Sequence, residues 1–167
     1  MRLNDLFKDE DDLANWLDFN NYSWRGGFSK VYDLGDNYVL KVTEDEPYLS
    51  FFKLVTEYCN GNKHFPVIYD CWIIGDCYYI LMEKLYHHDL FISEEAEMAG
   101  YYVYDTGLWT GILGSLNKTL DILEAWFKLK HKEDGLHWDL RDSNVMQRKD
   151  GTLVIIDPFS ESEYDTW

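Results

Sequence analysis

Apolar residues change their spacing early in the chain, and the change separates a helix from a set of strands. Between residues 9 and 20, Leu13, Trp16 and Leu17 stand three and four positions apart, and acidic residues fill the first turn, where the helix dipole favours them. This pattern predicts a short amphipathic helix. Residues 22–43 instead hold β-branched and aromatic runs broken by glycines, which predicts two or three strands joined by tight turns.

A second helix and a hairpin are predicted next. Pro47 suits the first turn of a helix, and the Asn-Gly-Asn run at residues 60–62 is typical of a helix end. Residues 67–72 and 78–85 are strand-like, and the Gly-Asp pair between them has the chemistry of an antiparallel turn. The first half of the chain therefore predicts a small antiparallel sheet that carries one helix.

The second half has a mainly helical pattern. Residues 94–104 look helical, and from residue 106 to about residue 132 apolar residues recur at three- and four-residue steps, which predicts a long, mostly buried helix that Gly135 stops. A strand pair is predicted at residues 145–147 and 153–156. The predicted fold class is α+β, with an antiparallel sheet lobe followed by a reduced, mainly helical lobe.

Composition narrows the function classes. Of 167 residues, 46% are hydrophobic and 17% aromatic, which suffices for a packed core. With 15 basic and 31 acidic residues the formal net charge is −16, which disfavours direct binding to nucleic acid or to an anionic membrane surface. No apolar run approaches the ~20 residues that cross a bilayer. The three cysteines form no secretory framework and no leader is evident, so a cytoplasmic protein is expected.

The most informative chemistry lies between residues 137 and 159. Asn144 stands five positions after Asp139, and Asp157 follows an apolar strand. A phosphotransferase needs this combination, because one carboxylate must orient the attacking hydroxyl while a second carboxylate and an amide oxygen hold magnesium against the polyphosphate. The segment resembles the catalytic loop and the DFG segment of the protein-kinase superfamily.

Upstream segments resemble the ATP-binding parts of the same superfamily. Residues 38–42 resemble the strand whose lysine, here Lys41, pairs with the α- and β-phosphates. Residues 79–85 resemble the strand that leads to the adenine-binding hinge, with Glu83 and Leu85 at its end. The glycine-rich loop corresponds to Gly26, Gly27, Phe28 and Ser29. Because Ser29 replaces the last glycine of the family loop, a weaker or differently shaped phosphate clamp is expected.

The resemblance implies ATP and Mg²⁺ as cofactors and a role for each matched residue. Asp139 would orient the hydroxyl, Asn144 and Asp157 would bind Mg²⁺, and Arg141 would neutralise charge on the transferring group.

The superfamily also pairs its strand lysine with a helix glutamate. Glu57 is the candidate partner of Lys41 here, and Glu46 is the alternative.

A finer resemblance rests on four segments: G-F-S-x-x-Y, H-F-P-x-x-Y-D from His64, D-x-x-x-x-N-V-M and I-D-P-F. Together they resemble the early serine/threonine kinase of short-tailed coliphages. This implies a phage protein that phosphorylates host bacterial proteins, basic nucleic-acid-handling or transcription proteins among them, and itself. The implied division is an acidic N-terminal helix (1–21), an ATP-binding sheet (22–85) and a truncated helical part with the catalytic loop (86–167).

Two departures from the superfamily pattern both indicate that activation-loop phosphorylation is not used as a switch. Trp138 replaces the arginine that binds a phosphorylated activation loop, and the chain ends eight residues after Phe159 without an A-P-E segment. A minimal kinase that forms without this switch is expected.

Two other hypotheses stay open. The charge of −16 and the altered glycine loop also suit a kinase-shaped acidic protein, catalytically weak or dead, that inhibits a host enzyme as a nucleic-acid mimic or decoy. A small-molecule phosphotransferase would use the same three polar residues, because the fold does not determine the acceptor. The sequence does not indicate an oligomeric state.

Overall fold

The structure is a computed structural model that describes residues 1–25, 29–87, 116–140 and 142–161. Residues 1–45 and 67–84 form one compact unit, called unit 1. Residues 46–66 and those from residue 85 onward form the other, unit 2. The helix predicted at residues 94–104 and the first part of the long helix lie outside the described residues.

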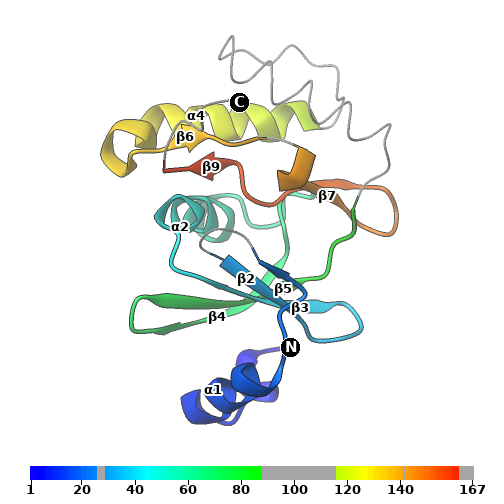
Figure 1. Ribbon diagram of the computed structural model, residues 1–167. Helices are drawn as coiled ribbons and strands as arrows, with labels where there is room; N and C mark the ends of the chain where they lie inside the picture. The colour runs from blue at the N-terminus through cyan, green and yellow to red at the C-terminus, as the bar shows by residue number, and fades with distance from the viewer. Residues whose placement is uncertain (26–28, 88–115, 141, 162–167) are drawn as a thin grey trace. The chain divides into compact units, whose positions relative to one another are not determined.

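Unit 1 is built on a five-stranded antiparallel sheet in the order β1-β2-β3-β5-β4 (Figure 1). Its strands are β1 (Trp24–Arg25), β2 (Ser29–Asp33), β3 (Tyr38–Thr43), β4 (Ile68–Ile74) and β5 (Cys77–Glu83). Gly75, in the β4–β5 turn, has a φ of 61°, a left-handed conformation that glycine adopts at little cost. The strands predicted in residues 22–43 and the hairpin predicted in residues 67–85 are confirmed.

The N-terminal segment covers one face of this sheet. It consists of a 3₁₀ turn, η1 (Leu3–Asp5), and α1 (Glu10–Phe19), whose N-cap Asp9 accepts a hydrogen bond from the Asp12 amide. The helix predicted at residues 9–20 is confirmed. The apolar core that joins this segment to the sheet contains Leu3, Phe7, Leu13, Tyr32, Leu40 and Leu81.

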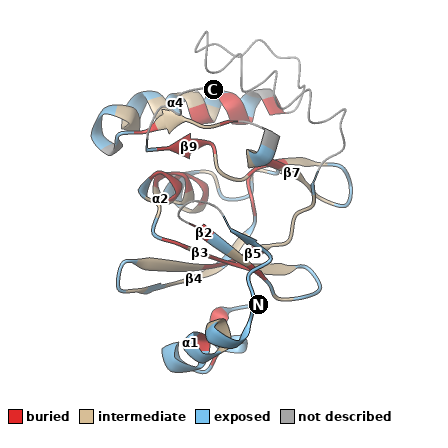
Figure 2. Cartoon of the chain, in the orientation of Figure 1, coloured by how far each residue is buried: buried red, intermediate tan, exposed pale blue. Residues whose placement is uncertain are grey.

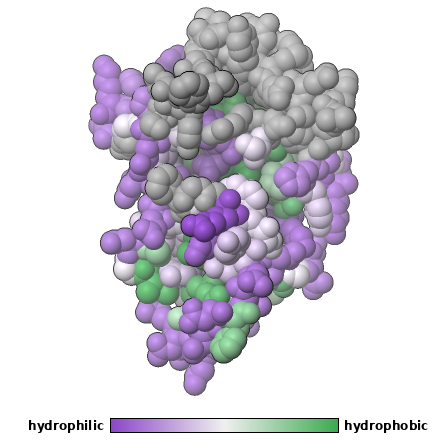
Figure 3. All heavy atoms as spheres, in the orientation of Figure 1, coloured by the Kyte–Doolittle hydropathy of each residue, from purple (hydrophilic) through white to green (hydrophobic). Residues whose placement is uncertain are grey.

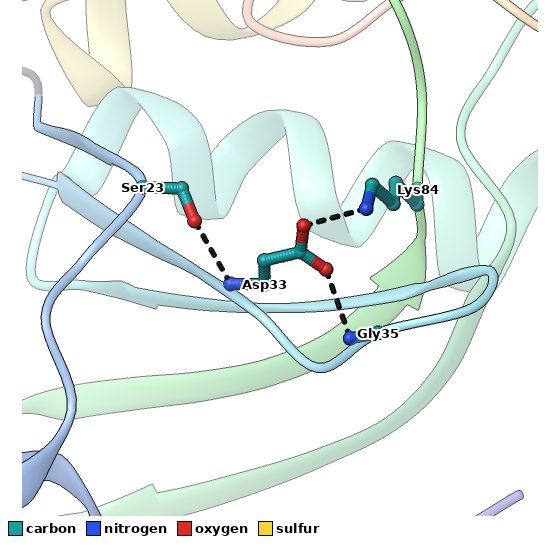
Figure 4. A network of polar contacts seen from close by, with 4 residues as sticks. All are labelled: Ser23, Asp33, Gly35 and Lys84. Atoms are coloured by element: carbon teal, nitrogen blue, oxygen red, sulfur yellow. Dashed lines mark hydrogen bonds and ion pairs between the residues drawn. The ribbon is translucent and has the colours of Figure 1, made fainter.

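A carboxylate at the end of β2 joins the β2–β3 turn to the end of β5 (Figure 4). Asp33 accepts hydrogen bonds from the Gly35 amide at 2.9 Å and from the Lys84 ammonium at 2.5 Å, and its own amide donates to Ser23 Oγ at 3.1 Å. The hydrogen bond from Lys84, followed by that from Gly35, lowers the pKa of Asp33. The turn after β2 and the segment after β5 are thus both hydrogen-bonded to the Asp33 carboxylate.

Unit 2 contains two helices and two small antiparallel sheets among its described residues. The helical elements are α2 (Glu46–Lys53), a π-helical turn (Leu54–Tyr58) that continues it, and α4 (Asn117–Asp134). The sheets pair β6 (His137–Trp138) with β9 (Phe159–Ser160), and β7 (Val145–Gln147) with β8 (Leu153–Ile155).

The predictions for unit 2 hold for most of these elements. The helix after Pro47 and the β7–β8 pair are confirmed, and Gly135, with a φ of 63°, ends α4 as predicted. The β6–β9 pair was not predicted from the sequence. Figure 2 shows buried positions on α2, α4 and β9, and Trp126 of α4 donates from its indole N–H to Ser50 Oγ of α2 at 3.1 Å.

The described helices include none with the length and apolar character needed to cross a membrane.

Candidate active site

Asp139 and Asn144 are joined at the two ends of one short loop in unit 2. Asp139 directly follows β6, and Asn144 ends the 3₁₀ turn η4 (Asp142–Asn144) just before β7. The Asn144 Nδ2 atom donates to the Asp139 carboxylate oxygen Oδ2 at 2.9 Å and to the Asp139 backbone carbonyl at 2.6 Å. Because the amide nitrogen of Asn144 faces Asp139, its amide oxygen is directed away from that carboxylate and is placed to accept or to ligate.

Two backbone hydrogen bonds bracket Asp157 and bring its segment to this loop. The Ile156 amide donates to the Asn144 carbonyl at 2.9 Å, and the Asp139 amide donates to the Pro158 carbonyl at 2.8 Å. Asp157 lies between the two bonded residues, and its Oδ1 atom is shielded from solvent. The backbone therefore holds the segment of Asp157 next to both ends of the loop that joins Asp139 to Asn144.

His64 braces the strand that leads to Asp157. Its carbonyl accepts a hydrogen bond from the Ile155 amide at 2.9 Å, and its Nδ1 atom lies 2.7 Å from the Leu153 carbonyl. A carbonyl only accepts hydrogen bonds, so Nδ1 of His64 is the donor. His64 begins the H-F-P-x-x-Y-D segment, whose sequence does not by itself indicate this structural role.

Lys41 lies in unit 1, on the central part of the sheet. Its backbone partners are Val31 of β2 and Ile80 of β5, and its side chain is 6% exposed. Because side chains alternate along a strand, Lys41 faces the side of the sheet opposite to Leu40 and the α1 core. A buried ammonium is costly unless charged or polar groups compensate it, which makes this lysine a functional candidate.

Ser29 lies on the Lys41 side of the sheet. It is buried, and its hydroxyl donates to Thr43 Oγ1 at 2.8 Å across the β2–β3 pair. Gly26, Gly27 and Phe28, the other expected loop residues, lie outside the described residues, as does Arg141.

The two candidate partners of Lys41 both lie on the helical segment of unit 2. Glu46 is the first residue of α2, Glu57 lies in the π-helical turn, and both side chains are exposed. The pairing of Lys41 with either glutamate stays a prediction.

Glu83, at the end of β5, is engaged with Val67. The Glu83 amide donates to the Val67 carbonyl at 3.0 Å, and the Val67 amide donates to Glu83 Oε1 at 2.8 Å. Leu85 follows two positions later and is half-buried. Adenine binding by Glu83 and Leu85 stays a prediction.

A cavity of about 460 Å³ lies in unit 1 beside α1 and the sheet. It is lined by Leu17, Asp18, Arg25, Ser29, Lys30, Tyr32, Val42, Thr43, Glu44, Cys77 and Tyr79. Burial, followed by contact with Glu44, raises the pKa of the Cys77 thiol, and burial raises the pKa of Tyr79. Both groups are therefore protonated near neutral pH, and the cavity offers no thiolate nucleophile.

The donor chemistry of Asn144 and Asp157 fits magnesium. Mg²⁺ prefers oxygen ligands and is usually held by one or two protein groups together with phosphate and water oxygens. An amide oxygen and a carboxylate meet this description. Within the described ranges, no three His, Cys, Asp or Glu side chains converge into a separate metal site.

Comparison with known proteins gives only distant likenesses. No protein-family model and no curated protein match the sequence. Among solved structures, the chain is similar to WbdD at 2.2 Å resolution, with a TM-score of 0.47, 18% identity and coverage of 89% of this chain and 34% of that one. It is also similar to WbdD with the kinase inhibitor LY294002, with a TM-score of 0.46, 20% identity and coverage of 89% and 35%.

A third structure, titled the bifunctional kinase-methyltransferase WbdD, has a TM-score of 0.40 and 20% identity, over 83% of this chain and 31% of that one. The chain thus spans about a third of the length of these proteins. At such TM-scores and identities the likeness assigns no function to this chain.

Proposed function

We propose that this chain is a minimal serine/threonine kinase that transfers the γ-phosphoryl group of Mg-ATP. The observation that carries the proposal is the pair of backbone hydrogen bonds on either side of Asp157, which join it to Asp139 and Asn144. Phosphoryl transfer depends almost entirely on positioning and charge stabilisation, and this arrangement supplies positioned oxygen ligands beside a positioned carboxylate.

Asp139 acts on the acceptor hydroxyl in this proposal. Its carboxylate accepts the hydrogen bond of a serine or threonine hydroxyl, aligns the hydroxyl oxygen with the phosphorus atom and takes the proton as transfer proceeds. Asn144 restrains that carboxylate, because its Nδ2 donates to Asp139 Oδ2.

The other candidate residues would bind the nucleotide and its metal. The Asn144 amide oxygen and the Asp157 carboxylate would hold Mg²⁺, whose charge would offset that of the polyphosphate. Lys41 would pair with the α- and β-phosphates, and Arg141 would neutralise charge on the transferring group. Gly26, Gly27, Phe28 and Ser29 would cover the phosphates, and Glu83 and Leu85 would border the adenine.

The acceptors we propose are basic host bacterial proteins, with the chain as a phage enzyme acting in the host cytoplasm. The net charge of −16 favours encounter with basic partners. Most of the described surface on the face drawn in Figure 3 is hydrophilic.

The same charge also favours a second candidate function, a catalytically weak or dead acidic protein that binds and inhibits a host enzyme. Its affinity would fall steeply with salt and would not need Asp139 or Asp157. The two candidate functions therefore differ in whether they require Asp139 and Asp157.

The test is Mg²⁺-dependent transfer of label from [γ-³²P]ATP to the chain itself and to a bacterial lysate. Asp139→Asn should lower the rate by about 10²- to 10⁴-fold, as loss of a general base does. Asp157→Ala should abolish the magnesium dependence together with most of the label. Asp121→Asn, the same charge change at an exposed position of α4, should leave the rate unchanged.

Undiminished transfer by Asp139→Asn would remove Asp139 from the mechanism. Absence of label with the unaltered protein, together with no thermal shift on adding Mg-ATP, would overturn the kinase proposal and favour the acidic binding protein.

A further inference from the structure

Trp138 lies in an aromatic cluster of unit 2 directly beside the candidate active site. Its indole stacks on Phe127 of α4, with ring centroids 4.6 Å apart and planes at 27°. It also contacts Phe159 of β9 at 5.3 Å, and Phe127 and Phe159 stack at 6.1 Å. We call Phe127, Trp138 and Phe159 the aromatic cluster.

Two members of the aromatic cluster flank the acidic residues of the site. Trp138 immediately precedes Asp139, and Phe159 stands two positions after Asp157. The two aromatic residues are also direct partners in the β6–β9 pair. The third member, Phe127, belongs to an 18-residue helix and supplies a rigid surface for both.

We infer that Trp138 is a positioning residue, whose packing in the aromatic cluster holds the Asp139 loop and the Asp157 segment in register without a phosphorylated partner. The inference rests on the proposed function, and it explains how the Asp139 loop and the Asp157 segment are held together in that site. An arginine at this position would need an anion to hold it, whereas an indole needs only the apolar rings that the fold supplies. Transfer activity is then independent of prior phosphorylation of the chain.

The kinetic test compares Trp138→Ala with Trp138→Phe. Loss of the ring should lower kcat by about 10- to 100-fold, because displacements on the order of 1 Å at a reacting group cost this much. The KM for ATP should change less than kcat, since Lys41 and the other nucleotide-binding groups of unit 1 are unaltered. Trp138→Phe should recover most of kcat because it keeps an aromatic face on Phe127. Treatment of the unaltered protein with a phosphatase should leave kcat unchanged.

Trp126→Ala is the matched control. It removes another tryptophan of unit 2, one that packs on Tyr58 at 5.3 Å and bonds to Ser50. This control should lower the unfolding temperature and leave kcat within about threefold of the unaltered value, as expected for a purely structural position. Equal loss of kcat in Trp126→Ala and Trp138→Ala would overturn the inference.

A second measurement does not require catalysis. The Asp139 amide donates to the Pro158 carbonyl, so its hydrogen exchange reports whether the two segments are held together. In Trp138→Ala this amide should exchange at least tenfold faster, while amides of the β3–β5 pair keep their protection. Unchanged exchange at Asp139 in Trp138→Ala would overturn the inference. Absence of phosphate transfer by the unaltered protein would count against the proposed function alone, because the exchange measurement still decides the role of Trp138.

Discussion

The backbone hydrogen bonds of the two units have different roles, because those of unit 1 build a continuous sheet whereas those of unit 2 bring the candidate site residues together. In unit 1, β2 pairs with β3 and β4 pairs with β5 across turns of a few residues, and one apolar face is covered by α1. In unit 2, the bonds around the candidate site join separate segments, such as Asp139 with Pro158 and His64 with Leu153. Substitutions in the α1 core of unit 1 should therefore change stability, whereas substitutions at Asp139, Asn144 and Asp157 in unit 2 should change transfer.

The largest expected effect is on the stability of the α1 side of the sheet. Leu40 is fully buried there, and Leu40→Ala should lower the free energy of unfolding by about 2–5 kcal/mol through lost burial and a residual cavity. Urea denaturation measures this change. The same substitution at Leu129, which is 63% exposed, should change stability by less than about 0.5 kcal/mol. Equal effects at the two positions would contradict the packing described for unit 1.

The next effect concerns the site in unit 2. Asn144→Ala removes the hydrogen bonds to Asp139 and one candidate magnesium ligand, and it should lower the transfer rate by about 10²-fold. Steady-state kinetics with labelled ATP measures this loss.

Asn20→Ala, at the exposed C-cap of α1 in unit 1, is the control and should leave the rate unchanged. A normal rate in Asn144→Ala would show that the Asp139 carboxylate needs no such restraint.

A smaller effect is expected from the buried hydroxyl pair in unit 1. Thr43→Val removes the acceptor of the Ser29 hydroxyl and of the Asp45 amide, and it should cost about 1–3 kcal/mol of stability. The double variant Ser29→Ala with Thr43→Val should lose less than the sum of the two single losses, because neither hydroxyl is then left unsatisfied. Thermal unfolding of the four proteins measures this coupling, and strict additivity would argue against a direct Ser29–Thr43 bond.

The smallest expected effect comes from the exposed Asp33–Lys84 pair. Lys84 and Gly35 lower the pKa of Asp33 in the folded protein, so its contribution is full above the unfolded pKa of roughly 4 and is lost as pH falls through the folded value. Asp33→Asn should therefore cost about 0.2–1 kcal/mol at neutral pH. Unfolding curves recorded from pH 7 downward should converge for the two proteins below pH ~4. A difference that does not depend on pH would contradict the ion pair as its source.

Much of the fold is readable from local pattern, as the confirmed elements show. The β-branched and aromatic run in residues 38–43, the Gly-Asp turn at residues 75–76 and the left-handed Gly135 each depend on residues next to one another. The β6–β9 pair was missed because each strand has two residues, too few to show a period, and because η4, β7 and β8 lie between the two strands in the chain. The π-helical turn after α2 has no recognised sequence signal either.

For the candidate site, sequence alone determined the residue types: a carboxylate, an amide and a second carboxylate at kinase-like spacing, and one lysine within a strand. Only the tertiary structure decided that hydrogen bonds of Ile156 and Pro158 hold Asp157 next to Asn144 and Asp139. It also decided that His64 bonds to β8 and that Trp138 packs against Phe127 and Phe159. The reason is physical. Local pattern records the preferences of neighbouring residues, whereas these contacts arise when the folded backbone satisfies its remaining hydrogen bonds and excludes water from aromatic rings.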